Sequence, residues 1–400
     1  MIPGVSVSLS NGNIGGSANT SDGVVGQVIT GAGTGTIGLL QPCKFVSLDD
    51  AVAQGLTATA EPEANEFVTE FYNDAPIGSV LYLMLAANTS TIAELCDKTN
   101  TTGGASVLLN FAIGNAGGQI RVLGISRSPQ SGYTPSTDEF IDSDAIAAGT
   151  NAQALAAQYF AQNTPLRILI GARVTDASSA TVFAPNSIAY NAIGYTIGGS
   201  TTSGFGSVGM GTILAKVAAT QPQVNIGRVK DGPLSISAWY IGALPSTPPA
   251  SGTGSWYEQL NVLINAGYIT CTTYPNSNKA GYYVSDDPMA TSDTDDYQSL
   301  ANCRVIDKAA IIAYQAFLNY VNSEVLLQAG GTMDPADIAD IQSQIVNTMA
   351  QGLSGNISGS PSCYINPAQV FTAGTPFQVQ VRVIPYGYLK QIVVNLGFSF

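Results

Sequence analysis

The feature of this 400-residue chain that most restricts its fold is a series of short apolar runs that alternate with helix-like segments. Residues 79–87 (SVLYLMLAA) are continuously apolar over the length of one strand, as expected for a strand covered on both faces of a sheet. Similar strands are predicted at 120–125 and at 166–170 (LRILI). A helix capped by Ser90 and a second helix at about 147–162 separate them. This order predicts a parallel α/β sheet with right-handed crossover connections.

Periodicity and turn signals assign most of the remaining chain. The loop at 245–254 (PSTPPASGTG) is interpreted as the main domain boundary because it is rich in Pro, Gly and Ser. A late helix at 334–353 would be capped by Asp334, with Pro335 at its first helical position. The other predicted elements are helices at 63–72, 206–219, 256–266 and 296–327, strands at 224–229 and 234–241, and a hairpin that joins 268–273 to 281–285.

Both ends of the sequence carry strand patterns that need a partner edge. In the Gly-, Ser-, Thr- and Asn-rich residues 1–40, a short alternation of apolar residues with serines predicts one strand. Near the other end, residues 377–383 alternate in the same way, and a second apolar alternation follows a Pro-Tyr-Gly turn as a returning strand. The residues expected to form inter-subunit strands are Val5, Val7 and Leu9 near the start and Ile392, Val394 and Leu396 near the end.

The predicted fold class is a parallel α/β domain followed by an α+β domain, with extended strand arms at both ends. A chain of this length can bury more than one hydrophobic core. The expected division is an N-terminal arm at 1–40, an α/β domain at 41–244, a C-terminal domain at 255–375 and a C-terminal strand pair or arm at 376–400.

The chain has no histidine, and only 10% of its residues are charged, against roughly 25% in an average soluble protein. Without histidine it can form neither a Ser-His-Asp centre nor an imidazole zinc site. A net charge of −13 and a pI near 4.2 argue against nucleic acid as a partner. With few charged side chains, little free energy is lost to desolvation when two protein surfaces meet, so the composition favours protein–protein assembly. A surface that is merely polar and neutral would give the same composition.

Cysteine usage and hydropathy predict a protein made in a reducing cytoplasm. The five cysteines lie far apart without CxxC spacing, so they are interpreted as buried apolar residues rather than as a disulfide or metal framework. The longest apolar stretch, 80–87, is far shorter than the about 20 residues of a membrane span, so no membrane partner is expected. The first residues (MIPGVSV) have neither the basic segment nor the apolar core of a signal peptide.

Two GxGxxG matches, beginning at Gly33 and Gly204, are the only nucleotide-like signals. No clear helix follows the first, and the 43 glycines of the chain make chance matches frequent. A GxxxxGK[ST] phosphate loop and an SxxK nucleophile motif are both absent from the sequence. No cofactor is therefore predicted.

The densest charge run comprises Asp286, Asp287, Asp293, Asp295 and Asp296. These aspartates could bind a hard cation or supply the paired carboxylates of glycoside hydrolysis, although the Gly and terminal Glu of an EF-hand loop are missing. The structural alternative is that residues 293–296 cap the long helix that follows, where acids suit the positive end of the helix dipole. We favour capping, and predict no catalytic or metal-ligating residue.

Several motifs in the second half together resemble contractile tail sheath proteins. GYYVSDD occupies 281–287, Asp296-Tyr297 follows, and NCRVID at 302–307 precedes a long helix. NIGRVKDG at 225–232 and VRVIPYGY at 381–388 are also similar to that group. The order of these motifs carries the resemblance, which covers about 225–400 best. It is strongest to the compact sheaths of Mu-like phages and of Bacteroidetes phages or contractile injection systems.

The resemblance implies a subtilisin-like sheet without protease chemistry and a C-terminal domain that lines an inner tube. It also implies six-membered rings stacked in a helix, whose subunits are linked by terminal strands that neighbours exchange. The implied partners are other copies of the chain, an inner tail tube protein, and baseplate and terminator proteins. Assembly would occur in the bacterial host cytoplasm, and the product would be a virion tail or a contractile injection particle.

The expected function is a structural sheath subunit, not an enzyme, that contracts to drive the tube through a target envelope. Two alternatives stay open at this point. One is an extracellular surface or adhesion protein, and the other, less favoured, is a carboxylate-based glycoside hydrolase.

Overall fold

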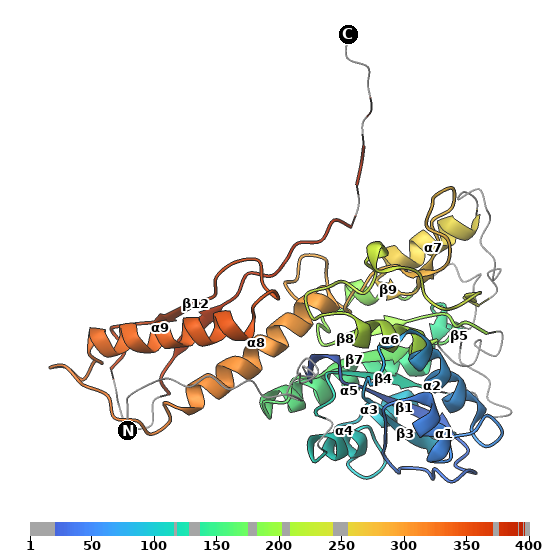
Figure 1. Cartoon of the computed structure of the whole chain (residues 1–400), viewed down its shortest axis with the longest axis horizontal. Helices are drawn as coiled ribbons and strands as arrows, with labels where there is room; N and C mark the ends of the chain where they lie inside the picture. Colours follow the sequence, from blue (N-terminus) through green and yellow to red (C-terminus); the bar gives the residue numbers. More distant parts are fainter. Residues whose placement is uncertain are drawn as a thin grey trace, which may run out of the picture.

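A computed structural model describes residues 21–115, 118–127, 137–174, 182–201, 209–242, 255–370, 376–390, 392–394 and 396. Within these residues the chain forms an α/β body from which a lobe built on two long helices projects (Figure 1). Among the same residues, no helix combines the length and apolarity needed to cross a membrane.

The body is built on a seven-stranded sheet with the order β2-β3-β1-β4-β7-β8-β9. Every neighbouring pair is parallel except β2 and β3, which confirms the predicted parallel sheet. β1 is an interior strand, since Val25 lies opposite both Leu81 and Val122. The strands are β1 (Val25–Gly31), β2 (Cys43–Phe45), β3 (Leu81–Ala87), β4 (Val122–Ser126), β7 (Arg167–Gly171), β8 (Ile193–Thr196) and β9 (Tyr268–Ile269).

Helices cover both faces of this sheet, which explains the nearly continuous apolar strands. On one face α2 (Pro62–Asp74) packs against α6 (Met210–Ala219), and on the other α3 (Ile92–Cys96) and α4 (Ser106–Ile113) lie with α5 (Ser143–Ala161) (Figure 1). All but the last residue of β3 and all of β4 are buried. The shorter α1 (Leu48–Ala53) contacts α2, and α7 (Ser255–Asn265) contacts β9.

The interior strand β1 lies where the sequence predicted an arm. Its position shows that residues 25–31 belong to the body and not to a linker. Gln27 is fully buried there, and its Nε2 donates a hydrogen bond to Ser126 Oγ on β4 at 2.7 Å. A polar side chain in the interior and the surrounding glycines broke the apolar pattern by which a strand is detected.

Two predicted strands, at 224–229 and 234–241, are wrong. The first segment turns at Asn225, whose Oδ1 accepts a hydrogen bond from Gly227 N at 2.7 Å, and it leads into a 3₁₀ turn at Val229–Asp231. In the second, the described residues form no strand; Tyr240 and Ile241 make isolated bridge contacts, that of Tyr240 with Gly199. Leu234, Trp239 and Ile241 are buried in this loop, and Trp239 Nε1 donates a hydrogen bond to Thr270 Oγ1 at 3.0 Å.

The predicted hairpin between 268 and 285 is divided between two sheets. Its first two residues form β9 at the edge of the main sheet, and only β10 (Cys271–Thr272) pairs antiparallel with β11 (Tyr283–Val284). A further small pair joins β5 (Thr137–Asp138) to β6 (Ile141–Asp142). The helix after β3 is capped by Thr91 and not by Ser90, through reciprocal hydrogen bonds with Glu94.

The lobe consists of α8 (Leu300–Leu318), α9 (Pro335–Gly352), β12 (Ser362–Ile365) and β13 (Val379–Arg382). The Asp334 cap is confirmed, since its Oδ1 accepts a hydrogen bond from Ala336 N at 2.8 Å. The apolar core of the lobe gathers side chains from both helices and the small sheet, among them Ala309, Ala316, Ile341, Ile345, Met349 and Ile365.

The two hydrophobic cores meet within α8. Leu300 and Cys303 pack with the body, whereas Ala309 and Ala316 pack in the lobe. Residues 255–299, which were predicted to belong to the C-terminal domain, therefore pack with the body. The loop at 245–254 lies outside the described residues.

Candidate assembly surface

A two-stranded antiparallel sheet on the lobe offers free strand edges. Cys363 lies opposite Val381 and Ile365 opposite Val379, and the sheet rests on α9. Ile365 is buried, whereas the neighbouring Tyr364 is 54% exposed. Within the described parts of the chain, β12 and β13 pair only with each other, so each strand has one unpaired edge. Such an edge is a template for a strand from another chain.

Residues after β13 form an exposed apolar arm. Ile392, Val394 and Leu396 were predicted to return along residues 377–383, but β13 pairs with β12 instead, and the described residues from 392 on form no strand. The reason is that β12 offers an apolar face already fixed on α9. The exposed fractions along the arm are 87% for Leu389, 72% for Ile392, 84% for Val393, 69% for Val394 and 93% for Leu396.

The N-terminal strand residues Val5, Val7 and Leu9 lie outside the described residues. Their expected pairing with another subunit therefore stays a prediction. The described chain starts beside the lobe, because Asp22 Oδ2 lies 2.8 Å from Lys308 Nζ on α8.

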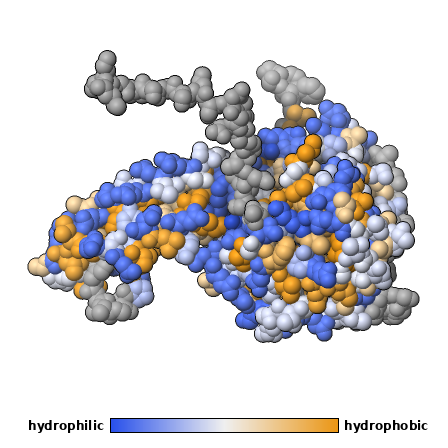
Figure 2. All heavy atoms as spheres, turned by 60° about the horizontal axis from the view of Figure 1, so that its bottom comes forward, coloured by the Kyte–Doolittle hydropathy of each residue, from blue (hydrophilic) through white to orange (hydrophobic). Residues whose placement is uncertain are grey.

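The surface of the lobe also exposes large apolar side chains. Figure 2 shows them between polar residues on the projecting part of the molecule. They gather at the far end of α8 and in the following connection: Tyr314, Leu318, Val321, Leu326 and Leu327 are 43–68% exposed. Exposed apolar surface of this kind is characteristic of contact with other protein chains.

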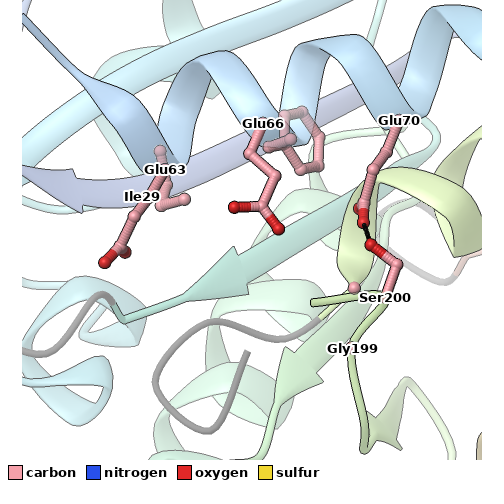
Figure 3. Close-up of a pocket in the computed structure, with 8 residues that line it drawn as sticks. Ile29, Glu63, Glu66, Glu70, Gly199 and Ser200 are labelled. Atoms are coloured by element: carbon pink, nitrogen blue, oxygen red, sulfur yellow. Dashed lines mark hydrogen bonds between the residues drawn. The ribbon is translucent and has the colours of Figure 1, made fainter. Parts of the chain in front are cut away.

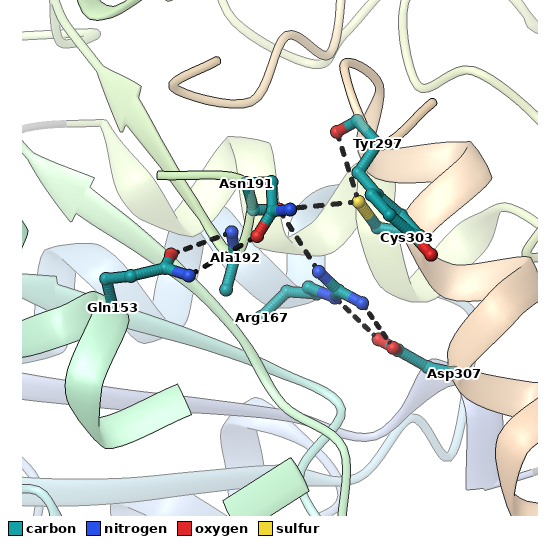
Figure 4. Close-up of polar contacts among 7 residues, drawn as sticks. All are labelled: Gln153, Arg167, Asn191, Ala192, Tyr297, Cys303 and Asp307. Carbon is teal, nitrogen blue, oxygen red and sulfur yellow. Dashed lines mark hydrogen bonds and ion pairs between the residues drawn. The ribbon is translucent and has the colours of Figure 1, made fainter. Parts of the chain in front are cut away.

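A buried ion pair joins α8 to the body (Figure 4). Arg167 on β7 donates from Nε to Asp307 Oδ2 at 2.7 Å, and its Nη2 donates to Asp307 Oδ1. A third hydrogen bond runs from Nη1 to the carbonyl oxygen of Asn191 at 3.1 Å. Both charged side chains are less than 10% exposed, so the pair is strongly directional and costly to break.

Arg304, one turn before Asp307, ties α8 to two further segments of the body. Its Nη2 donates to the carbonyl oxygens of Thr220 at 2.9 Å and Asp22 at 3.1 Å. Burial lowers the pKa of Arg304 to about 10, which still leaves the guanidinium charged at neutral pH. These contacts make the first two turns of α8 a rigid joint between body and lobe.

Three glutamates of α2 line a small cavity beside β1 (Figure 3). Glu70 accepts a hydrogen bond from Ser200 Oγ, and Glu66 Oε1 accepts one from Thr201 Oγ1 at 2.7 Å. Burial is the main cause that raises the pKa of Glu63 and of Glu70 to about 7. The cavity measures about 10 Å³, far below the roughly 300 Å³ at which ligand pockets begin.

The aspartates at 286–296 do not form the expected helix cap or a paired-carboxylate site. The acid at the start of α8 is Asp287, whose Oδ2 accepts from Ala301 N at 3.0 Å, while residues 293–296 lie in the preceding loop. Asp286 is paired with Lys390 at 2.7 Å. Neither of the two best-formed cavities is lined by these aspartates, and no metal-binding cluster of acids and cysteines occurs among the described residues.

Solved sheath structures share this architecture over the whole chain. The anti-feeding prophage helical sheath in its contracted state superposes with a TM-score of 0.59 at 14% identity, covering 99% of both chains. The contracted PVC sheath of an extracellular contractile injection system gives 0.57 at 11%, covering 99% of this chain and 97% of that one. A chain of the anti-feeding prophage baseplate gives 0.56 at 12%, covering 100% and 99%. The fold is therefore that of contractile sheath-type proteins, as the sequence motifs predicted.

The chain belongs to the DUF2586 family. Its residues 2–288 match the DUF2586 N-terminal domain, and residues 296–400 match the DUF2586 C-terminal domain. No curated protein matches the sequence.

Proposed function

We propose that this chain is a structural subunit of a contractile sheath, which polymerises helically around an inner tube and contracts to drive the tube through a target envelope. The observation that carries the proposal is a sheath-type fold over the full chain in which, among the described residues, β12 and β13 each keep an unpaired edge and an apolar arm is exposed. In this role the chain is not an enzyme. The proposed partners are other copies in six-membered stacked rings, an inner tube protein, and baseplate and terminator proteins.

The linking strands in this proposal are residues 5–9 and 392–396, which would add to the free edges of β12 and β13 in neighbouring subunits. Strand addition gives affinity through main-chain hydrogen bonds, and every second side chain of the added strand gives specificity by packing against the receiving subunit. Because donor and acceptor surfaces differ, the contact is heterologous. Heterologous contacts close into rings or continue as open helices, so they are compatible with six-membered rings stacked in a helix.

Contraction in this proposal is mechanical. Subunits assemble in the host cytoplasm around the tube in a metastable extended state, then rotate outward and bury more inter-subunit surface. The stored energy is conformational and needs no nucleotide. The joint formed by Arg167, Arg304 and Asp307 supports this view, because it lets body and lobe move as one unit while the arms bend.

Negative-stain electron microscopy of the concentrated protein tests the proposal. We expect long hollow tubes from the full chain, and a folded subunit without tubes after deletion of residues 1–12. A Val5→Ser, Val7→Ser, Leu9→Ser variant keeps the length of the segment and should also form no tubes, whereas Val7→Ile should form them normally. Intact tubes from the deletion variant would refute the linking role of this segment. A full-length protein that stays monomeric at high concentration would favour the adhesion alternative.

A further inference from the structure

Three segments that are distant in the sequence meet at the root of the C-terminal arm. Tyr388 Oη on the arm donates a hydrogen bond to the carbonyl oxygen of Gln223 at 2.9 Å. Two residues later, Lys390 Nζ lies 2.7 Å from Asp286 Oδ2, in the segment before α8. We call Gln223, Asn225 and Asp286, which receive the arm on the body, the arm seat.

The anion of the arm seat is held in a fixed orientation. Asn225 Nδ2 lies 2.7 Å from Oδ1 of both Asp286 and Asp287, so one amide bridges the two carboxylates. Asp287 is itself buried and accepts hydrogen bonds from Ser299 Oγ at 2.9 Å and from Ala301 N at 3.0 Å. Asp286, the acceptor for Lys390, is therefore held in place through Asn225 and Asp287. Its side chain loses little further conformational entropy when Lys390 binds.

The arm is attached on both sides of its Pro-Tyr-Gly turn, and the attachment ends at the seat. Upstream of the turn, Ser358 N and Oγ each donate at 2.9 Å, to the carbonyl oxygens of Ile384 and Pro385 respectively. Downstream, Tyr388 and Lys390 bind the seat. The described residues that follow, Ile392, Val393, Val394 and Leu396, are all at least 69% exposed.

We propose that the arm seat is a positioning site that fixes where the C-terminal linking strand leaves its own subunit. With Lys390 seated, Ile392 can move only about 7 Å from the last fixed residue, at about 3.3 Å per extended residue. With the seat empty, the last fixed residue is Pro385, and Ile392 can reach about 23 Å. A short reach raises the effective concentration of the strand at one neighbouring edge and excludes more distant edges. This inference rests on the proposed sheath function.

The contacts between the arm and the arm seat are weak enough to be reversible. Lys390 is 40% exposed and Asp286 19% exposed, so their attraction is partly screened by solvent. One such ion pair shifts an opening equilibrium by up to about five-fold, and one hydroxyl hydrogen bond shifts it by about two- to tenfold. Loss of either contact should therefore free the arm root without unfolding the body.

Limited trypsin digestion of the unassembled subunit tests the proposal, because Lys390 is itself a cleavage site. Asp286→Asn and Tyr388→Phe should each speed cleavage after Lys390 by about five-fold. Tyr386→Phe makes the same change at an exposed tyrosine two residues earlier and should leave the rate unchanged. Cleavage after Arg382, which lies in the paired strand β13, reports whether the fold is intact. Hydrogen exchange of amides 386–390 provides a second measurement.

Equal cleavage after Lys390 in the wild type, Asp286→Asn and Tyr388→Phe, with Arg382 still protected, would overturn the arm seat even if tubes form. Absence of tubes from the wild-type protein would instead count against the sheath function, while the digestion still measures the seat. When the wild type forms tubes, both seat variants should give about five-fold fewer tubes at equal concentration, and Tyr386→Phe should match the wild type.

Discussion

Removing the charge of Asp307 should strongly destabilise the subunit, because it leaves Arg167 charged and buried between body and lobe. The side chains of Arg167 and Asp307 are 8% and 7% exposed, and two donor nitrogens of the guanidinium point at the carboxylate. Breaking such a pair from one side costs about 3–5 kcal/mol. We therefore expect Asp307→Asn to lower the free energy of unfolding by about 3 kcal/mol, since the amide oxygen keeps one of the two acceptors.

Urea unfolding of the unassembled subunit, followed by the fluorescence of Trp239 and Trp256, measures this loss. Asp231→Asn is the matched control, since Asp231 pairs with Arg228 at 2.8 Å but these side chains are 22% and 40% exposed. An exposed pair contributes about 0–1 kcal/mol, so the control should change stability by less than about 1 kcal/mol. Equal losses in Asp307→Asn and Asp231→Asn would refute the argument that burial makes the joint costly to break.

Two further predictions concern the body. The pKa of Glu63 and of Glu70 is raised to about 7 in the folded state, so the folded protein binds more protons than the unfolded chain between about pH 4.5 and pH 7. The free energy of unfolding should therefore fall as pH rises through this window, by at most about 1.4 kcal/mol per pH unit for each carboxyl. Glu70→Gln should make the Tm measured by thermal unfolding depend less steeply on pH. An unchanged pH dependence in this variant would contradict the raised pKa of Glu70. Gly198 has φ +92° and an added Cβ would lie 2.2 Å from Trp239 Nε1, so Gly198→Ala should cost at least about 2 kcal/mol. Gly232 has φ +91°, and no atom lies within 4 Å of an added Cβ, so Gly232→Ala should cost only about 1 kcal/mol. Equal Tm shifts for the two variants would show that backbone strain alone, and not the clash with Trp239, sets the cost of the substitution.

The elements that the sequence predicted well are those whose burial is uniform along their length. β3 is apolar throughout because helices cover both of its faces, and α9 begins at an aspartate followed by proline. The sheath-like motifs at 225–232, 281–287 and 302–307 meet near the start of α8. Asn225 Nδ2 donates a hydrogen bond to Asp287 Oδ1 at this point.

The predictions that failed depended on contacts between distant segments. β1 contains the buried Gln27, whose Nε2 donates hydrogen bonds to the carbonyl oxygen of Val28 and to Ser126 Oγ, which lies 99 residues later in the sequence. Residues 234–241 have the pattern of a strand, yet they form a loop in which Trp239 is buried and donates a hydrogen bond to Thr270. The strand pair at the C-terminal end was assigned to the wrong partner because β12 already offered β13 a fixed apolar face.

By itself, the sequence determined that the chain has a parallel α/β body, two long late helices and a composition without imidazole chemistry. The sheet and the helices could be predicted because the local spacing of apolar residues indicates which side chains face an apolar layer. Only the tertiary structure decided that β1 is an interior strand of the sheet, that the cores meet within α8, and that Lys390 is paired with Asp286. The physical reason is that the sequence around a charged residue or a strand edge does not identify the residue or strand that will pair with it. Arg167 and Asp307 lie 140 residues apart, and only folding brings them together.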